Sequence, residues 1–358
     1  MNDNSVCLTI DGQEVRAPKG ASLLQVARDN GFDIPGLCYL EGLTPTGSCR
    51  LCVVKIENKR GYLTACTVEV EDGMKVTAFD EELEKMRKAT LELILTEHNY
   101  DCSICHKAGE CELQDLAYKY QMGIDVNRTL PPLEREHHYP FDTTSPVLAH
   151  DSSKCIRCGR CIMACGDVQG KEVLSFVHRG LATFVSPEFR QWSKSSCDGC
   201  GECIQSCPTG ALTEKPLSGM VRVFDADSKV RTTCVYCGVG CQMEAWVKDN
   251  TVVRVRGYDE KPNHGRLCVK GRFGFEFIKD KERLKKPLIK KNGKFEEAEW
   301  DEALDLVASK FSDIKKTHGP NTLAGLASAR VTNEENYVFQ KFFRAVLQTN
   351  NVDHCARL

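Results

Sequence analysis

The sequence has no apolar stretch that approaches the length needed to cross a lipid bilayer, and its first ten residues lack the charged and then apolar pattern of an export signal. It also lacks an excess of charge of either sign. Its 48 basic and 50 acidic residues give a formal net charge of -2, which offers no argument for a nucleic-acid partner or an anionic membrane. We therefore predict a cytoplasmic protein with no transmembrane segment and no nucleic-acid partner.

Cysteine, in contrast, is abundant, with 21 residues in a chain of 358. Thiols stay reduced in the cytoplasm, so we expect few disulfides, and soft thiolates in that setting bind soft metals. The cysteines fall into five groups, at 38–66, 102–111, 155–165, 197–207 and 234–268. Cys7 and Cys355 stand apart, and we expect both to be free thiols packed as small hydrophobic side chains.

The first group belongs to a predicted domain over residues 1–80. Alternating residues at 7–10, a turn at Asp11-Gly12 and a helical pattern over 21–30 predict a strand, a hairpin and a helix. The predicted ligands of a 2Fe-2S cluster are Cys38, Cys49, Cys52 and Cys66. A structural zinc is the alternative, because two cysteines separated by two residues also occur in zinc sites. The order of a long loop, a close pair and a distant fourth cysteine is similar to plant-type ferredoxins, which implies a β-grasp fold.

The second group lies in a predicted region over residues 81–129, where the pattern over 82–97 predicts a helix that ends at a histidine. The four residues of interest are His98, Cys102, Cys105 and Cys111. Haem attachment through Cys-x-x-Cys-His and a zinc site are the alternatives. Beside a 2Fe-2S domain, this spacing resembles the histidine-ligated 4Fe-4S site of the large electron-input subunit of respiratory complex I and of iron-only hydrogenases. The resemblance implies that His98 is the fourth ligand.

A proline-rich segment over 130–146 is predicted to be a linker, and a repeated cysteine pattern follows it over 147–222. The run beginning at Cys155 recurs 42 residues later, at Cys197, with the same internal spacing. This spacing is that of bacterial ferredoxins with two 4Fe-4S clusters, in which the fourth cysteine of each run ligates the other cluster. The two predicted ligand sets are Cys155, Cys158, Cys161 and Cys207, and Cys197, Cys200, Cys203 and Cys165.

The fifth group lies in a predicted domain over 227–283, and its predicted 4Fe-4S ligands are Cys234, Cys237, Cys241 and Cys268. The motif Cys-Val-Tyr-Cys-Gly-Val-Gly-Cys, with Gly-Arg-Leu-Cys-Val-Lys-Gly-Arg over 265–272, resembles the N-terminal 4Fe-4S domain of molybdopterin-dependent oxidoreductases, especially formate dehydrogenases. In that family a lysine two residues after the last cysteine lies between cluster and pterin and helps to pass electrons. Lys270 has the matching position; a solvated loop lysine is the alternative.

Residues 284–358 have an α/β pattern, with a helix expected from Trp300 and a strand over 322–326. The segments 328–337 and 349–358 again resemble formate dehydrogenases, in which the next residue is the selenocysteine or cysteine that ligates molybdenum or tungsten. We interpret the last residue as the position before a UGA selenocysteine codon; an artificial boundary of the sequence is the alternative. On this interpretation residues 284–358 are the truncated start of a pterin-binding domain.

The expected architecture is an α+β multi-domain chain with a β-grasp 2Fe-2S domain, a histidine-ligated 4Fe-4S region, a ferredoxin-like domain with two 4Fe-4S clusters, a molybdopterin-type 4Fe-4S domain and an α/β piece. The resemblance implies the catalytic subunit of a formate dehydrogenase that interconverts formate and carbon dioxide, with a molybdenum or tungsten bis-molybdopterin guanine dinucleotide in the full-length enzyme. The implied electron route runs from the pterin past Lys270, through the Cys234 cluster and the ferredoxin pair, to the His98 cluster and the 2Fe-2S centre.

Partners implied by the resemblance are an NAD(P)H-flavin subunit, a hydrogenase or a ferredoxin. A non-catalytic electron-wire subunit of a hydrogenase or NADH-linked complex is the alternative function. The 358-residue chain by itself is expected to be inactive, because it lacks the metal ligand and most of the pterin domains that the family has.

Overall fold

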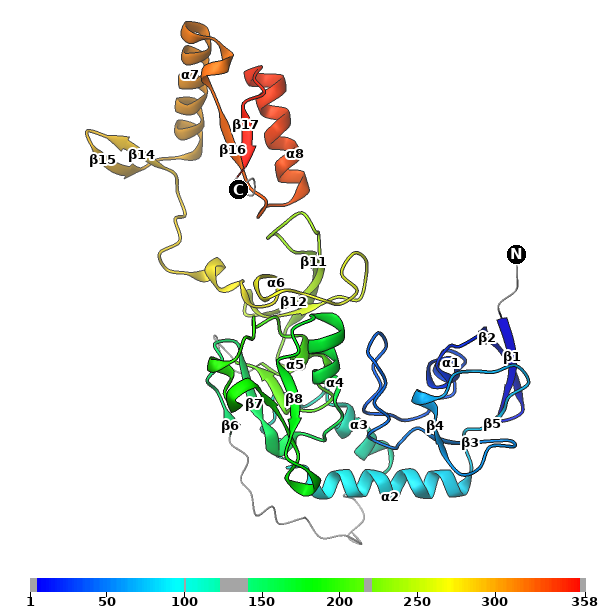
Figure 1. The fold of residues 1–358 in the computed structure, drawn as a ribbon. Coiled ribbons are helices and arrows are strands. Elements are labelled where there is room, and N and C mark those ends of the chain that lie inside the picture. The colour runs from blue at the N-terminus through cyan, green and yellow to red at the C-terminus, as the bar shows by residue number, and fades with distance from the viewer. Residues whose placement is uncertain (1–4, 100, 123–140, 216–220, 355–358) are drawn as a thin grey trace. The chain divides into compact units, whose positions relative to one another are not determined.

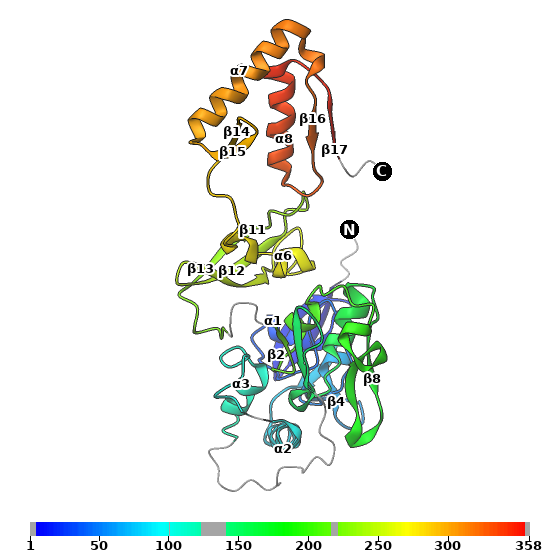
Figure 2. The same cartoon turned by 90° about the vertical axis from the view of Figure 1, so that its left-hand side faces the viewer.

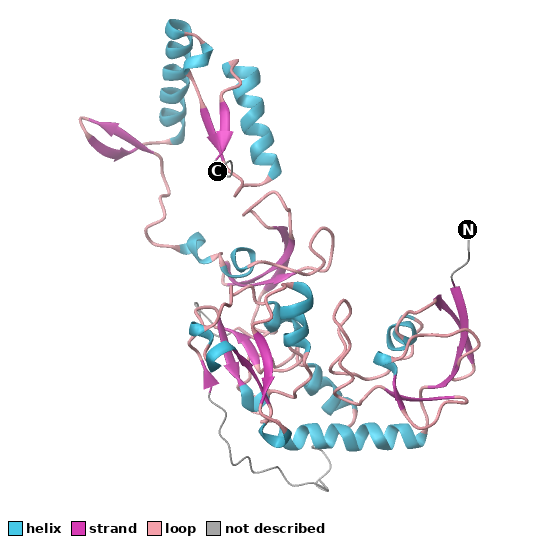
Figure 3. Cartoon of the chain, viewed as in Figure 1, coloured by secondary structure: helices cyan, strands magenta, loops and turns pink. Residues whose placement is uncertain are grey.

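The computed structural model describes residues 5–99, 101–122, 141–215 and 221–354 (Figure 1). It divides into two compact units, Met1–Ala226 and Asp227–Leu358, which are taken separately below. Helices and strands are interspersed along both units, so the chain is a mixed α/β multi-domain protein (Figure 3). Cys355 lies outside the described residues, as do residues 130–140 of the predicted linker, which include His137 and His138.

The N-terminal part of the first unit is a five-stranded sheet with the strand order β2-β1-β5-β3-β4. Its strands are β1 (Ser5–Ile10), β2 (Gln13–Pro18), β3 (Val53–Ile56), β4 (Leu63–Thr64) and β5 (Lys75–Thr77). β1 and β2 form an antiparallel hairpin, and β1 pairs in parallel with β5. The hairpin and the following helix α1 (Leu23–Asp29) confirm the elements predicted for this segment, and α1 packs four buried residues into the same core.

Helix α2 (Glu81–Glu97) begins at the N-cap Asp80, whose side chain accepts a hydrogen bond from the Leu83 amide. It confirms the helix predicted over 82–97. Arg87 on this helix is fully buried, and its Nη2 atom donates to the carbonyl oxygens of Val53 at 2.8 Å and Ala78 at 2.7 Å. A buried guanidinium with these partners fixes α2 against the end of the five-stranded sheet.

Replacement of Arg87 by Met is expected to reduce the free energy of unfolding by about 3 kcal/mol, because it leaves two buried carbonyl groups without their donor and Glu84 without its ion pair. Thermal melting of the cluster-loaded chain, followed by far-UV circular dichroism, measures the effect. Lys85→Met is the matched control on the same helix. Its ion pair with Glu81 is exposed, so the melting temperature should barely change. Equal shifts in both variants would contradict the role given to Arg87.

After the short helix α3 (Glu112–Lys119), the rest of the first unit carries the two repeated cysteine runs. A three-stranded sheet has the order β10-β7-β6, with β6 (Phe141–Asp142), β7 (Leu148–Asp151) and β10 (Leu212–Glu214). β6 lies inside the segment predicted to be a linker, so the sheet begins before the first cysteine run. A hairpin of β8 (Leu174–Val177) and β9 (Phe184–Pro187) lies between the runs. The first run leads into the short helix α4 (Arg160–Met163), which continues as η3 (Ala164–Val168), and the second run leads into the short helix α5 (Glu202–Ser206).

The second unit starts with a three-stranded antiparallel sheet of β11 (Ser228–Thr233), β12 (Gln242–Lys248) and β13 (Thr251–Gly257). Helix α6 (Val269–Phe273) contacts β13, and Figure 2 shows it close to the strands of this sheet. Trp246 on β12 is almost fully buried, with the cationic groups of Lys229 and Arg254 within 5 Å of its ring centre. This sheet presents the two loops that carry the fifth cysteine group.

The last part of the second unit begins with the hairpin of β14 (Leu288–Lys291) and β15 (Lys294–Glu297), followed by helix α7 (Trp300–His318). Helix α8 (Asn333–Lys341) continues as η9 (Phe342–Leu347), and the strands β16 (Gly325–Ala327) and β17 (Val352–His354) pair in parallel. The helix predicted from Trp300 is confirmed. The strand predicted over 322–326 is shifted, because Thr322 ends the short 3-10 helix η8 (Pro320–Thr322) and the strand covers Gly325–Ala327. None of the residues of α7 is buried, and the core here consists of Leu323, Phe343 and Leu347 with a few partly buried neighbours.

Within the described ranges, no helix combines the length and the apolar character that spanning a membrane requires.

Candidate metal centres

The first cysteine group meets in the core of the N-terminal sheet domain. The side chains of Cys38, Cys49, Cys52 and Cys66 are at most 8% exposed and belong to one hydrophobic cluster. Cys38 contacts the thiols of Cys49 and Cys66, and Cys66 contacts Cys52. The Leu37 amide donates to the Cys49 Sγ atom at 3.4 Å, a contact that stabilises a thiolate ligand.

Four thiols this close cannot all ionise without a compensating cation. The hydrogen bonds from Cys49 and Cys66 lower the pKa of Cys38, whereas the contact with Cys38 and burial raise the pKa of Cys49. The pKa of Cys66 is also raised, first by its contact with Cys38. Metal ligation requires the thiolate form, so a cluster with positively charged irons removes the repulsion that the bare site would have.

The two ferredoxin-type runs have the same backbone conformation, as their common spacing predicts. The second residue after the first cysteine has a positive φ in each run, 55° at Arg157 and 67° at Gly199, and its amide donates to that cysteine's Sγ atom. The glycine that precedes each helix is also left-handed, with φ of 80° at Gly159 and 79° at Gly201. The left-handed residues thus turn each loop so that backbone amides face the first cysteine sulfur, an arrangement that suits a cluster site.

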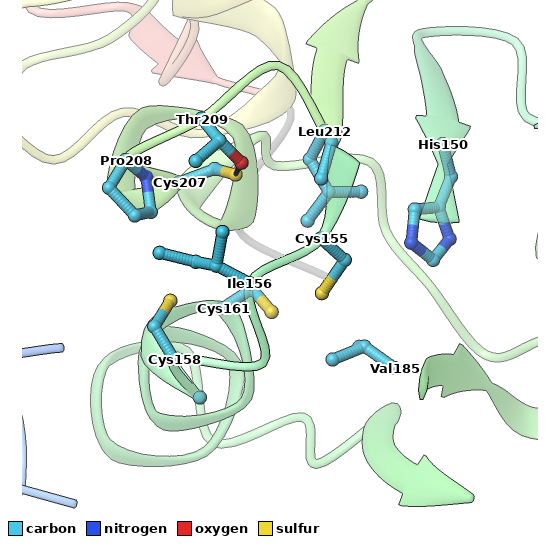
Figure 4. A pocket seen from close by; sticks show the side chains of 12 residues that line it. His150, Cys155, Ile156, Cys158, Cys161, Val185, Cys207, Pro208, Thr209 and Leu212 are labelled. Carbon is cyan, nitrogen blue, oxygen red and sulfur yellow. Dashed lines mark hydrogen bonds between the residues drawn. The ribbon is translucent and has the colours of Figure 1, made fainter. Parts of the chain in front are cut away.

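One cavity has the side chains of Cys155, Cys158, Cys161 and Cys207 in its lining (Figure 4). Its volume, including space open to solvent, is about 340 Å³. These four thiols come from both runs, and they interact electrostatically with one another. The remaining thiols of the two runs, Cys165, Cys197, Cys200 and Cys203, form a second interacting group. The folding of the runs therefore supports the crossed assignment of the fourth cysteines.

A buried histidine lines the same cavity. His150 on β7 is 4% exposed, and burial lowers its pKa to about 4, so the ring is neutral at pH 7. Its Nδ1 atom accepts a hydrogen bond from Trp192 Nε1 at 3.4 Å, which places the ring proton on Nε2, beside the Ser152 hydroxyl at 3.4 Å. His150 therefore adds a polar but uncharged group to this cavity.

The second cysteine group lies against the ferredoxin runs. His98 immediately follows α2, and Cys105 lies close to both Cys102 and Cys111. Burial raises the pKa of Cys111 to about 11. The loop packs tightly on the ferredoxin runs, because a Cβ atom at Gly210 would lie 2.6 Å from the Cys105 Sγ atom. Lys154, the residue before Cys155, ion-pairs with Asp101 at 2.8 Å across the same contact.

The loop of the first group also contacts the first ferredoxin run. The hydroxyl groups of Thr46 and Ser48 donate to the Cys158 carbonyl oxygen at 3.0 and 3.1 Å. The Thr44 amide donates to the Asp167 carboxylate at 2.8 Å. Local sequence patterns do not identify these polar contacts, because such patterns do not show which residues of one domain face another.

The fifth group lies at one end of the β11–β13 sheet. Cys234, Cys237, Cys241 and Cys268 interact electrostatically with one another. The backbone of Cys234 donates to the Cys241 carbonyl at 2.8 Å, which closes the loop between them. Lys270 is exposed and lies on α6, which begins directly after Cys268.

The chemistry of the donor sets suits iron-sulfur clusters, because nineteen of the twenty proposed ligands are cysteine thiols. A 4Fe-4S cluster separates its thiolates more widely than one tetrahedral zinc does, and soft thiolates suit iron-sulfur chemistry. Grouped thiols, tightly turned loops and amide-to-sulfur hydrogen bonds are the features expected of such sites.

Comparison with protein families gives matches to five family models along the chain. The models are described as a 2Fe-2S iron-sulfur cluster binding domain (residues 3–80), an NADH-ubiquinone oxidoreductase-G iron-sulfur binding region (87–125), an NADH-quinone oxidoreductase subunit 3 ferredoxin-like domain (145–213), a molybdopterin oxidoreductase Fe4S4 domain (227–280) and a molybdopterin oxidoreductase domain (283–358).

The chain is also similar to curated proteins over nearly its whole length. It is 36% identical to the NADPH-Fe(3+) oxidoreductase subunit alpha of Geobacter sulfurreducens, over 99% of this chain and 40% of that protein. It is 37% identical to an NADH-quinone oxidoreductase subunit of Rhizobium meliloti, over 98% and 40%. A Staphylococcus aureus protein that is provisionally named a formate dehydrogenase is 31% identical, over 98% and 39%. The chain thus spans about two fifths of the length of these relatives.

Among solved structures, a chain of an NAD+-reducing [NiFe]-hydrogenase in the H2-reduced state is similar, with a TM-score of 0.55 and 29% identity. The match covers 60% of this chain and 89% of the hydrogenase chain.

Proposed function

Since this chain joins iron-sulfur domains of the NADH-quinone oxidoreductase G type to molybdopterin oxidoreductase domains, we propose that it carries electrons between a molybdopterin site that oxidises formate and a partner redox subunit. It is an iron-sulfur electron-transfer chain of these oxidoreductases. The observation that carries the proposal is the grouping of the cysteine thiols into separate sets, which range from the buried set around Cys38 to the partly exposed set that ends at Cys268.

The proposed ligands are the five sets predicted from the cysteine spacing, one for a 2Fe-2S cluster and four for 4Fe-4S clusters. When bound, each cluster takes up and releases one electron at a time. The protein would hold the thiolates, bury those of the 2Fe-2S set, and donate amide hydrogen bonds to the sulfurs of Cys49, Cys155 and Cys197. Support for the set with Cys207 comes from the cavity that it shares with Cys155, Cys158 and Cys161.

Within the first unit, the contacts between the ligand loops support an electron route that differs from the one implied by the resemblance, in which the His98 cluster lies between the ferredoxin pair and the 2Fe-2S centre. The loop of the 2Fe-2S set bonds directly to the Cys158 carbonyl through Thr46 and Ser48. The loop of the His98 set packs on the same domain at Gly210 and Lys154. We therefore place the Cys155 set between the 2Fe-2S set and the His98 set.

The formate proposal concerns the activity of a whole protein, whereas this chain spans about two fifths of the length of the relatives that it matches. It draws support from the resemblance of the sequence segments 328–337 and 349–358 to formate dehydrogenases and from the provisionally named relative. Formate oxidation would deliver carbon dioxide, a proton and two electrons, and Lys270 is proposed to help their passage toward the Cys234 set. Molybdenum and tungsten are both compatible with a bis-molybdopterin guanine dinucleotide.

The test uses the complete assembly, isolated anaerobically from its own cells together with its partner subunits. Addition of formate is expected to reduce the clusters, as seen by electron paramagnetic resonance. Lys270→Met should slow formate-dependent reduction of the clusters by about tenfold or more, a barrier change of roughly 1.4 kcal/mol, while dithionite still reduces them fully. The exposed Lys279→Met on the same segment is the matched control and should behave as wild type.

In a second candidate function, the chain only transfers electrons within an NADH-linked or hydrogenase complex. The relatives named for NADH and NADPH and the similarity to the hydrogenase chain favour it. A flavin subunit that oxidises NAD(P)H, a hydrogenase or a ferredoxin would then be the partner. If NAD(P)H reduces the clusters of the isolated assembly and formate does not, this function replaces the formate proposal.

A further inference from the structure

A buried arginine lies where the loops of three cluster sets meet. Arg160 follows Cys158 by two residues, precedes Cys161, and is 3% exposed. Its Nη1 and Nη2 atoms lie 2.5 and 2.8 Å from the two carboxylate oxygens of Glu112, and Nη2 also donates to the Tyr39 carbonyl at 2.7 Å. The guanidinium of one residue on the Cys155 loop thus contacts residues on the loops of the other two sets.

Those partners are the immediate neighbours of proposed ligands. Tyr39 follows Cys38 of the 2Fe-2S set, and Glu112 follows Cys111 of the His98 set. The Glu112 amide also donates to the Pro208 carbonyl at 3.0 Å, directly after Cys207. The arginine and the glutamate together therefore connect the ligand loops of the 2Fe-2S set, the His98 set and the Cys155 set through short hydrogen bonds.

The internal repeat shows that the ferredoxin fold does not itself require this arginine. Glu202 occupies the equivalent position of the second run, directly after a left-handed glycine in the same way, and it is 2% exposed. Either charge is compatible with the local backbone. The guanidinium is therefore best explained by its partners outside the run, namely Glu112 and the Tyr39 carbonyl.

The geometry has physical consequences. A bidentate arginine-carboxylate pair fixes the orientation of both groups, and a buried charge without its partner is strongly unfavourable. A positive charge beside a cluster also stabilises its reduced, more negative state, and Glu112 partly offsets that effect. Removing the guanidinium should therefore change both the spacing of the loops and the electrostatic potential that they experience.

We propose that Arg160 and Glu112 are positioning residues that fix the spacing and the relative reduction potentials of the 2Fe-2S, His98 and Cys155 clusters. The step they serve is the transfer of one electron from a reduced cluster to an oxidised neighbour, with no bond formed and no proton moved. The inference rests on the proposed function only in requiring that the clusters be bound. It does not depend on formate.

The experiment uses the full, cluster-loaded chain, prepared anaerobically, with two readouts. Redox titration followed by electron paramagnetic resonance gives the potential of the 2Fe-2S cluster. Microwave power saturation of its signal gives its magnetic coupling to the neighbouring clusters, which weakens steeply with distance. The variants are Arg160→Gln, Arg160→Lys and Glu112→Gln, with Arg179→Gln as the matched control. The Arg179 side chain is exposed and lies between the two cysteine runs, outside the ligand loops.

Arg160→Gln is expected to decrease the ratio of reduced to oxidised 2Fe-2S cluster by about five- to tenfold at a fixed potential, a shift of up to about 59 mV. Its signal should also saturate at lower power. Arg160→Lys keeps the charge but loses the bidentate geometry, so saturation should change with little shift in potential. Glu112→Gln should shift the potential in the opposite direction. The control should change neither readout.

If Arg160→Gln binds the full iron content and both readouts match wild type, the inference is wrong. It is equally wrong if a lower melting temperature is the only change in that variant. Should Arg160→Gln fail to fold, Glu112→Gln carries the test, and an unchanged potential and saturation in it overturn the inference. A wild-type chain that shows no cluster signals would instead overturn the proposed function.

Discussion

Removing iron from the chain with a chelator and an oxidant is expected to lower the melting temperature of the first unit by at least about 10 °C. Cluster ligation typically contributes several kcal/mol, and a loss of roughly 5 kcal/mol shifts a unit of this size by that much. The structural reason is that Cys38, Cys49, Cys52 and Cys66 belong to the same core as β1, β5 and α1. Without metal, thiols with opposing pKa shifts would remain buried against one another.

Calorimetry or circular dichroism on loaded and iron-free chains measures the effect, and reconstitution with iron and sulfide should restore the loaded value. Cys7→Ser is the matched control. The Cys7 thiol contacts Glu14 at 3.0 Å and belongs to none of the proposed sets, so this variant should keep its iron and its melting temperature. An iron-free chain that melts at the loaded temperature would show that the clusters do not support the fold.

The crossed pairing of the ferredoxin runs predicts a distinctive pattern of iron loss. Replacing Cys155 and Cys207 together by Ser should remove about four irons, because both belong to one 4Fe-4S site. Replacing Cys197 and Cys207 together should remove about eight, because they belong to different sites. Uncrossed ligation would reverse the two results. Iron and acid-labile sulfide analysis of the purified variants distinguishes these outcomes.

The same variants should interrupt electron flow. Loss of the cluster held by Cys155 and Cys207 is expected to slow reduction of the His98 cluster by electrons entering at the 2Fe-2S site by about a hundredfold, or roughly 2.7 kcal/mol in barrier. Ser152→Ala, near the same cavity but outside the ligand sets, is the control and should retain the iron of both sites. Unimpaired transfer in the doubly substituted chain would show that the 2Fe-2S site bypasses the Cys155 set.

The sequence reveals the elements and the candidate ligands because both depend on local patterns. The hairpin after Cys7, helix α2 and the start of α7 at Trp300 follow from periodicity and turn residues, and the structure confirms them. The repeated spacing from Cys155 to Cys207 indicates two equivalent loops, and the equal φ angles at Gly159 and Gly201 agree with it. Such features are determined within a few residues.

The contacts between domains could not be read in the same way. Arg160 and Glu112 lie 48 positions apart, and Arg160 and Tyr39 lie 121 apart, so their meeting depends on how separate domains pack. The only hint in the sequence was that the second run has Glu202 where the first run has Arg160. This difference marks Arg160 as unusual but does not identify the residue that it contacts. The strand β6, inside the segment predicted as a linker, is likewise explained by pairing with β7 and not by its own sequence.

The close packing of the ligand loops also determines when metal can enter. The Cys158 carbonyl is covered by Thr46 and Ser48, and Cys158, Cys161 and Cys207 are each at most 8% exposed. A scaffold protein that hands over a preformed cluster needs direct access to these sulfurs. We therefore expect cluster insertion to be faster before the N-terminal sheet domain closes onto the ferredoxin runs than after it.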